Sequence, residues 1–175
     1  MEFRFETTYD KNAFTAMART LRKTVRKKHS RRSHILGGLV VALGLFFLFL
    51  PDENGIVFDS SAIITILAVA AIIVVFFCED QLNGLVAMKR MLPGLEKDTA
   101  VFREDGYISE NAIGKSEWQY SNIHAIAETP DYFIFIFGNN HAQLYDKWHM
   151  SGGTASEFRS FMEEKTGKNI EMLDK

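Results

Sequence analysis

The sequence offers few residues that could do chemistry, and their spacing matches no known metal site. Imidazole is both a metal ligand and a general base near neutral pH, so the histidines come first. The chain has five of them: His29, His34, His124, His141 and His149. The single cysteine, Cys78, ends an apolar run, which excludes a disulfide framework and a cysteine-based metal site. No H-E-x-x-H pattern is present, so we predict no metal and no cofactor, and we expect His29 and His34 to be solvated.

Catalytic motifs are also missing from the sequence. Ser116, His124 and Asp131 could be combined into a Ser/His/Asp set, but no G-x-S-x-G element supports a nucleophilic serine. The chain has no P-loop and no G-x-G-x-x-G fingerprint for binding phosphates. Glu104 and Asp105 stand before Gly106, a pattern that indicates a turn rather than an acid/base pair. We therefore interpret the protein as a non-enzyme.

The two tryptophans are the more informative side chains. Trp118 is predicted to lie in the core of a small sheet-and-helix domain. Trp148 and Met150 stand just before two glycines and a helix start, and an exposed aromatic beside a methionine is typical of a partner-contact surface. Packing of Trp148 between a sheet and a helix is the favoured alternative, so Trp148 and Met150 are candidates for partner contact only.

Two apolar runs, 35–50 and 62–78, organise the rest of the chain. Neither contains a charged residue, and their lengths of about 16 and 17 residues approach the roughly 20 that span a bilayer. The core helix of a soluble protein normally keeps a polar face, and these runs have none. We predict a two-span transmembrane hairpin over 35–78 with an external turn at 51–61. The first run has no cleavage site after it, so we expect a retained span rather than a cleaved leader.

The charge distribution indicates the orientation of this hairpin. Residues 1–34 hold ten Lys and Arg against three Asp and Glu, whereas residues 35–175 hold ten against nineteen. Seven of these basic residues come close before the first span and are candidates for contact with the membrane leaflet: Arg22, Lys23, Arg26, Lys27, Lys28, Arg31 and Arg32. The turn between the runs carries only acidic charge. The positive-inside rule then predicts that both termini are cytoplasmic.

The arm at 1–34 combines a short strand with a basic amphipathic helix. Residues 1–7 alternate apolar and polar side chains, and Asp10 is a predicted helix N-cap. The helix could lie on the anionic leaflet, bind nucleic acid, or pack against the soluble domain. We favour packing together with leaflet contact. Nucleic acid is disfavoured as a partner, because the basic face has no interleaved aromatic residues.

The pattern after the second span predicts a connector helix over 79–94 and a cytoplasmic domain over 95–175. Pro93 and Gly94 end the helix. Six short segments then have strand character: 99–104, 107–111, 116–120, 125–129, 132–137 and 141–145. Thr154 and Glu157 form a capping box for a last helix, and Gly167 is its predicted C-cap. The fold class is α+β: a transmembrane helical hairpin plus a small antiparallel sheet capped by a C-terminal helix.

Over nearly its whole length the chain resembles the YcxB-like family of bacterial membrane proteins. The resemblance consists of the N-terminal strand and helix, the two-span hairpin and several short runs of the C-terminal domain, taken in order. The runs are 102–108 (FREDGYI), 118–123 (WQYSNI), 127–129 (AET), 144–147 (LYDK) and 157–161 (EFRSF). The resemblance implies a pleckstrin-homology-like (PH-like) domain, a place in the bacterial inner membrane and no catalytic motif. The family usually has Ile-Pro-Lys where this chain has Tyr145, Asp146 and Lys147, so that strand end is expected to differ.

The function we expect is a membrane-tethered adaptor or regulatory protein that presents a PH-like domain to the cytoplasm. Its partners would be the lipid bilayer and either an unknown protein or a second copy of the chain. The alternative is a self-associating module that senses the leaflet or envelope stress. Residues 79–175 hold ten basic against sixteen acidic residues, which argues against an anionic-headgroup pocket there. A transporter role is disfavoured, because the spans contain no intramembrane charge.

Overall fold

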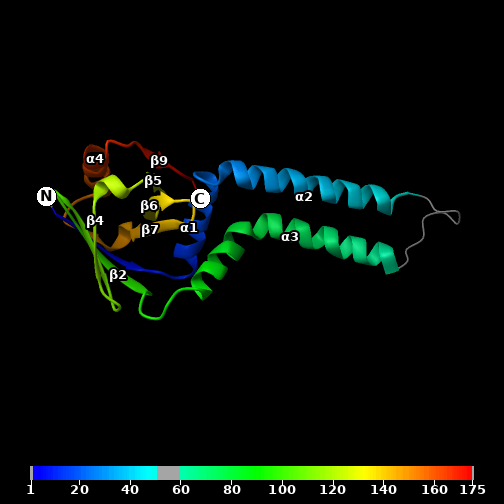
Figure 1. Cartoon of the computed structure of the whole chain (residues 1–175), viewed down its shortest axis with the longest axis horizontal. Coiled ribbons are helices and arrows are strands. Elements are labelled where there is room, and N and C mark those ends of the chain that lie inside the picture. The colour runs from blue at the N-terminus through cyan, green and yellow to red at the C-terminus, as the bar shows by residue number, and fades with distance from the viewer. Residues whose placement is uncertain (1, 51–59, 175) are drawn as a thin grey trace.

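Figure 1 shows a computed structural model of the chain, which describes residues 2–50 and 60–174. A domain of strands and helices lies at one end, and two long helices run side by side away from it. The expected α+β class is confirmed, with a helical hairpin, antiparallel sheets and a C-terminal helix. Residues 51–59, which make up most of the predicted external turn, lie outside the described residues.

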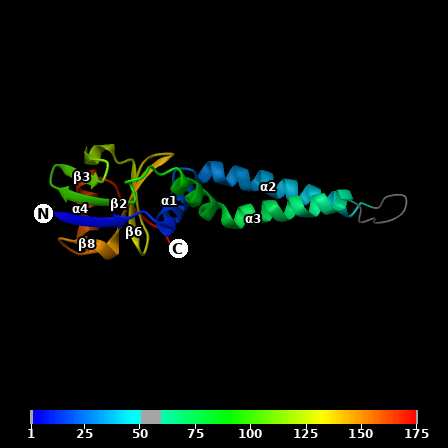
Figure 2. The same ribbon diagram turned by 90° about the horizontal axis from the view of Figure 1, so that it is seen from below.

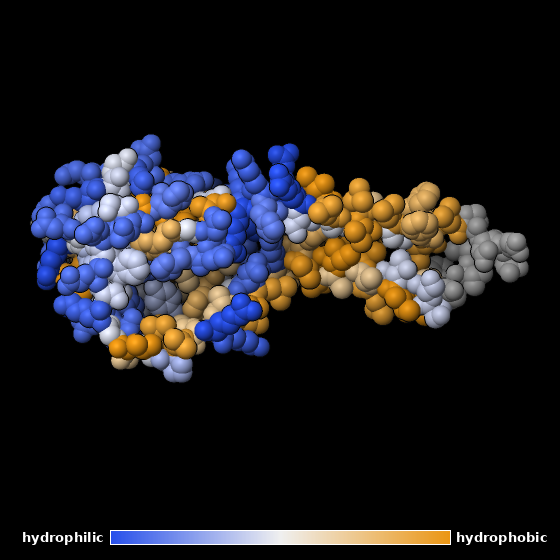
Figure 3. Space-filling model, in the orientation of Figure 1, coloured by the Kyte–Doolittle hydropathy of each residue, from blue (hydrophilic) through white to orange (hydrophobic). Residues whose placement is uncertain are grey.

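The two long helices are α2 (Lys27–Leu48) and α3 (Ser60–Lys89), and each is long and apolar enough to cross a membrane. Hydrophobic side chains cover much of their surface, whereas the domain is mostly hydrophilic (Figure 3). Helix α3 runs without a break through the second apolar run and most of the connector, as predicted. Helix α2 already begins at Lys27, so the basic segment forms its first turns.

The strands of the domain form two sheets. The first has the order β4-β3-β2-β1-β8 and consists of β1 (Phe3–Thr8), β2 (Lys97–Arg103), β3 (Gly106–Asn111), β4 (Lys115–Trp118) and β8 (Met150–Ser151). The second has the order β7-β6-β5-β9 and consists of β5 (Ala125–Glu128), β6 (Tyr132–Gly138), β7 (His141–Asp146) and β9 (Ile170–Met172). All six strands predicted after residue 95 are therefore present, with ends shifted by a few residues.

Strand β1 lies inside the first sheet. It pairs antiparallel with β2, where Phe3 stands opposite Phe102, and with β8 on its other side (Figure 2). The side chains of Phe3 and Phe5 are fully buried. The alternation at 1–7 predicted a strand, but not this central position. Strand β9, which pairs in parallel with β5, was not predicted either.

Aromatic side chains fill the space between the sheets, and α4 (Ala155–Thr166) closes it. Phe158 of α4 lies 5.2 Å from Phe3 and 4.9 Å from Phe102, measured between ring centroids. The predicted capping box is present, because Thr154 and Glu157 each bond the other's backbone N–H. Gly167 adopts the left-handed conformation at the C-cap, with φ +65°. Local sequence signals therefore define both ends of the helix that closes the core.

Helix α1 (Lys11–Lys23) lies between the domain and the long helices. Asp10 caps it by accepting a hydrogen bond from the backbone N–H of Ala13, as predicted. Its apolar face packs on the second sheet through a cluster of buried side chains: Ala13, Met17 and Leu21 with Ile134, Ile136 and Leu144. Packing of the basic helix against the domain, one of the three alternatives raised above, is confirmed. Helix α1 also packs against α3, so it joins the two parts of the molecule.

Candidate functional site

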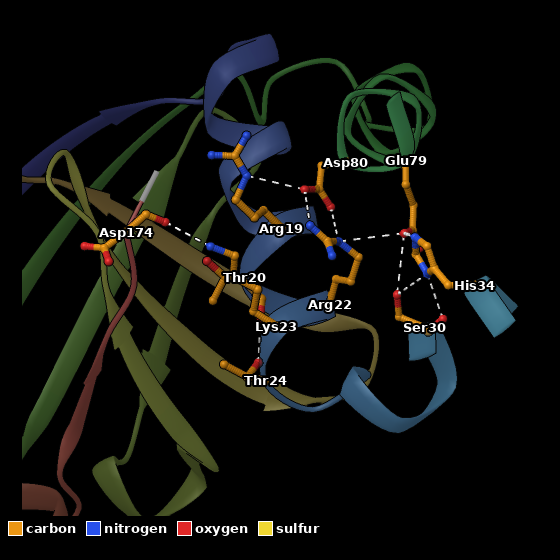
Figure 4. Close-up of polar contacts among 10 residues, drawn as sticks. All are labelled: Arg19, Thr20, Arg22, Lys23, Thr24, Ser30, His34, Glu79, Asp80 and Asp174. Carbon is orange, nitrogen blue, oxygen red and sulfur yellow. Dashed lines mark hydrogen bonds and ion pairs between the residues drawn. The ribbon is translucent and has the colours of Figure 1, made fainter. Parts of the chain in front are cut away.

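Polar side chains gather where α1, α2 and α3 meet (Figure 4). We name this group the junction cluster; it consists of Arg19, Arg22, Ser30, His34, Glu79 and Asp80. Asp80 is buried, with 7% of its surface exposed. Arg22 donates from Nε to Oδ1 at 2.6 Å and from a terminal guanidinium nitrogen to Oδ2 at 2.7 Å. Arg19 Nε donates to Oδ2 at 3.3 Å. A buried carboxylate needs such donors, since it has lost its water.

Glu79 and His34 extend the cluster from α3 to α2. The His34 Nε2 atom lies 3.4 Å from Glu79 Oε2, and the imidazole stacks on Phe76 of α3 at 4.9 Å between centroids. His34 Nδ1 lies 2.8 Å from the carbonyl oxygen of Ser30, so this nitrogen carries a hydrogen. The hydroxyl of Ser30 also points to Glu79, at 3.5 Å. His29 is exposed, as predicted, whereas His34 is only partly solvated: its side chain is 37% exposed and packs between the two long helices.

A glycine allows α1 to come close enough to α3 for these contacts. A Cβ atom at Gly84 would lie 2.7 Å from the backbone nitrogen of Thr15 and 2.9 Å from the carbonyl carbon of Phe14. These are backbone atoms of α1, which a rotamer change cannot move. Gly84 comes one turn after Asp80 on α3, so the close approach and the buried ion pair lie on the same contact.

The end of α1 is also tied to the domain. Arg26, just after α1, donates from Nε to the carbonyl oxygen of Asn139 at 2.6 Å, in the turn between β6 and β7. The Lys23 ammonium donates to the carbonyl oxygen of Asp174 at 3.0 Å. The basic side chains at the end of α1 therefore contact both the helical hairpin and the domain. Together with the junction cluster, they can hold the hairpin and the domain at a fixed spacing.

The predicted leaflet residues fall into two groups. Arg22, Lys23 and Arg26 have the protein contacts described above. The other four are exposed along the first turns of α2: Lys27, Lys28, Arg31 and Arg32. These four can reach a lipid surface without breaking a contact that the described residues make.

Trp148 and Met150 have different environments. Trp148 is 76% exposed, and its indole N–H donates to Asp131 at 3.2 Å. The favoured prediction that Trp148 packs between sheet and helix is therefore wrong, because a short 3-10 turn (Lys147–His149) turns it outward. Met150 is half-buried and packs against the core from β8. Trp118 is half-buried and packs against the same core, as predicted.

A second buried carboxylate lies in the domain, near Trp148. Glu128 at the end of β5 is 1% exposed and accepts from Arg159 at 2.6 and 2.9 Å and from Lys147 at 2.8 Å. Burial alone would raise the pKa of Glu128, but the hydrogen bonds and positive charges of Arg159 and Lys147 outweigh it and hold the pKa below its ordinary value. This triad ties α4 and the turn before β8 to the second sheet.

Sequence reasoning missed most of the junction cluster. The pattern predicts a connector helix that begins at residue 79, but it assigns no contact to Glu79, Asp80 or Ser30. The ion pair between Asp80 and Arg22 did leave a signal in the sequence. Acidic residues directly follow an uncharged span, and Arg19 and Arg22 stand three residues apart on one face of a helix.

Comparison with known proteins supports the resemblance drawn from the sequence. Residues 102–162 match the model of a family described as YcxB-like protein. The match runs from β2 into α4 and is to the same family that the sequence resembles. Among the curated proteins searched, none matches the chain.

Proposed function

We propose that the protein is a non-enzymatic, membrane-tethered adaptor or regulatory protein. Its two long helices would span the inner membrane of a bacterium, with both termini and the domain on the cytoplasmic side. Exposed basic residues at the start of α2 support this orientation, because Lys and Arg beside a span favour the cytoplasmic face. These residues are Lys27, Lys28, Arg31 and Arg32. The two sheets, antiparallel except for the short β5–β9 pairing, and their closure by α4 support a PH-like fold for the domain.

The contact between Asp80 and Arg22 carries this proposal. A domain on a flexible tether samples many orientations, whereas a buried bidentate ion pair between α1 and α3 allows one. Strand β1 extends this coupling into the first sheet, where it pairs with β2 and β8. A protein built in this way presents one constant face of its domain relative to the membrane plane. Such a fixed orientation suits a protein that recruits or positions a partner beside the bilayer.

Trp148 is the best candidate for the recruiting surface. It is exposed, its indole N–H is oriented by Asp131, and its backbone N–H is bound by Asp146 Oδ1 at 2.9 Å. An aromatic side chain held in place loses little entropy on binding, which is typical of interface anchors. The turn that carries Trp148 precedes β8, which lies toward the end of the domain away from the long helices (Figure 2).

Photo-crosslinking in cells tests the proposal directly. A photoreactive amino acid replaces Trp148 in the full chain, and the same amino acid replaces Ile113 as a matched control. Ile113 is also an exposed apolar residue, at 59%, but lies in the turn between β3 and β4. We expect position 148 to capture one discrete protein, or a second copy of the chain, that position 113 does not. Identical captures from both positions, or lipid alone, would contradict the proposed contact surface.

A further inference from the structure

A cavity of about 390 Å³ lies away from the junction cluster, between α1, the end of α3 and the free edges of both sheets. Strand β4 is the last strand of the first sheet and β7 is the last strand of the second. Trp118 of β4 and Gln143 of β7 both line the cavity. Its volume is in the range of small-molecule sites, about 300–1,000 Å³.

One wall of the cavity is apolar. Phe14 and Met17 of α1 face it from one side, and Met91 and Leu95, just after α3, face it from another. Of these four side chains, Met17 is buried and the rest are half-buried. Flexible methionines beside an aromatic ring adapt to ligands of different shape, so this wall suits a hydrocarbon or aromatic group.

A buried carboxylate also lines the cavity. Asp98 of β2 is 8% exposed and accepts from the hydroxyl of Ser109 at 2.7 Å. Among the ion pairs of the described residues, none involves Asp98, although Arg90 also lines the cavity from an exposed position. Burial raises the pKa of Asp98, and the hydrogen bonds from Ser109 and Asn111, which lower it, do not cancel this effect. A cation bound here would supply the charge compensation that a buried carboxylate normally requires.

Two further side chains limit the chemistry of the ligand. Gln143 uses its amide oxygen to accept from the hydroxyls of Tyr107 and Tyr145, at 2.6 and 2.7 Å, so this oxygen is already occupied. The Nε1 atom of Trp118 is buried and has no hydrogen-bond acceptor among the described residues. Asp98 is therefore the group in the cavity that is best placed to bind an ammonium.

We propose that this cavity binds a small amphipathic amine, with its ammonium group on Asp98 and its apolar group against Phe14, Met17, Met91 and Leu95. The site is independent of the proposed adaptor function, since it uses neither Trp148 nor the junction cluster. Its ligand would contact the end of α3 and both sheet edges at once, and so would bind the hairpin and the domain together.

Ligand titration of the full chain in lipid nanodiscs tests this site. In a Trp148→Phe background Trp118 is the remaining tryptophan, and its fluorescence reports on the cavity. Three probes share one apolar group and differ in charge: phenoxyethylamine, phenoxyethanol and phenoxyacetate. We expect saturable binding of the amine, at least about tenfold tighter than the alcohol, since a charged hydrogen bond adds to affinity. Empty nanodiscs correct for partition into lipid. Equal affinity for amine and alcohol, or tighter binding of phenoxyacetate, would overturn the proposal.

Two variants separate the roles of the charges. Asp98→Asn keeps the shape of the side chain and should remove the preference for the amine, while the affinity for the alcohol stays. Arg90→Gln removes the competing cation and should leave amine affinity unchanged or increase it. A preference retained in Asp98→Asn, or an amine affinity lowered tenfold in Arg90→Gln, would show that the ammonium is not on Asp98. If Asp98→Asn does not fold, Ala87→Phe places a ring in the cavity from an exposed position without adding a tryptophan. It should abolish amine binding, and retained binding would refute the site.

Discussion

Asp80 on α3 accepts hydrogen bonds at 2.6 and 2.7 Å from the guanidinium of Arg22 on α1, a residue 58 positions earlier in the chain. The pair joins the N-terminal arm to the second long helix at the point where that helix leaves its apolar run. Because Asp80 is buried, the pair cannot be exchanged for water without cost. Its loss should therefore affect both the stability of the molecule and the orientation of its domain.

The first prediction concerns this pair. Asp80→Ala leaves two guanidinium groups without their acceptor and should lower the free energy of unfolding by about 2 kcal/mol. Thermal unfolding of the full chain in detergent measures this. Glu6→Ala is the matched control, because its pair with Arg4 is exposed and contributes little. In a double-mutant cycle with Arg22→Gln, additive effects would show that the two side chains do not depend on each other.

The second prediction concerns the close approach of α1 and α3. Gly84→Ala should destabilise the protein by about 2 kcal/mol, because the new methyl group meets the backbone of Thr15 and Phe14. Alanine is the better helix former by about 1 kcal/mol, so intrinsic propensity predicts the opposite sign. Gly38→Ala on α2 is the control, since a Cβ there meets nothing within 4 Å. Equal effects of both substitutions on the unfolding temperature would rule out the steric explanation.

Much of the fold could be predicted because its signals are local. The alternation before Thr8, the cap at Asp10 and the capping box at Thr154 each lie within a few residues of the structure they form. The position of β1 could not be predicted, because its pairing of Phe3 with Phe102 joins residues far apart in the chain. The same holds for β9, whose short parallel pairing with β5 has no sequence pattern of its own.

The candidate site was harder to predict than the fold. Basic residues before a membrane span have a topological explanation, so nothing in the pattern distinguishes Arg22, which binds Asp80, from Arg31, which is exposed. The break between α1 and α2 makes this difference, because it turns the chain between the two arginines. Trp148 was misplaced for a related reason: its exposure depends on a 3-10 turn held by Asp146, not on the apolar character of the residue.

The third prediction is a pH dependence that arises from Glu128. Its pKa is held below the ordinary value of 4.5 in the folded protein, so its carboxylate stabilises the fold above that pH. This contribution is lost as the pH falls below about 4.5 and through the folded pKa. Glu128→Gln should cost about 3 kcal/mol at pH 7, and the difference from the wild type should shrink toward pH 3. Denaturant unfolding at several pH values checks this, with exposed Glu110→Gln as control. A difference that does not change with pH would contradict the role of the charge.

The fourth prediction follows from the position of β1 inside the first sheet, between β2 and β8. A fragment of residues 95–175 lacks the strand that fills the first sheet between β2 and β8, so it should not fold. The loss of Phe3 and Phe5 alone removes about 3–5 kcal/mol each, comparable with the stability of a whole domain. Joining residues 1–26 to 90–175 through a flexible linker restores β1 and α1 and should restore cooperative unfolding. Cooperative unfolding of the shorter fragment would show that β1 is dispensable.

The fifth prediction tests the orientation through the exposed bases of α2. A reporter fused after Lys175 should be active in the cytoplasm for the wild type. Four substitutions to glutamate should move at least part of the population to the opposite orientation, because these residues carry much of the positive charge beside the first span: Lys27, Lys28, Arg31 and Arg32. The control changes four basic residues of the domain, all at least 25 residues after the second apolar run: Arg103, Lys115, Lys165 and Lys168. An external reporter in the wild type would refute the orientation. A cytoplasmic reporter in the fourfold α2 variant would mean that Arg22, Lys23 and Arg26, held by their protein contacts, are sufficient to set it.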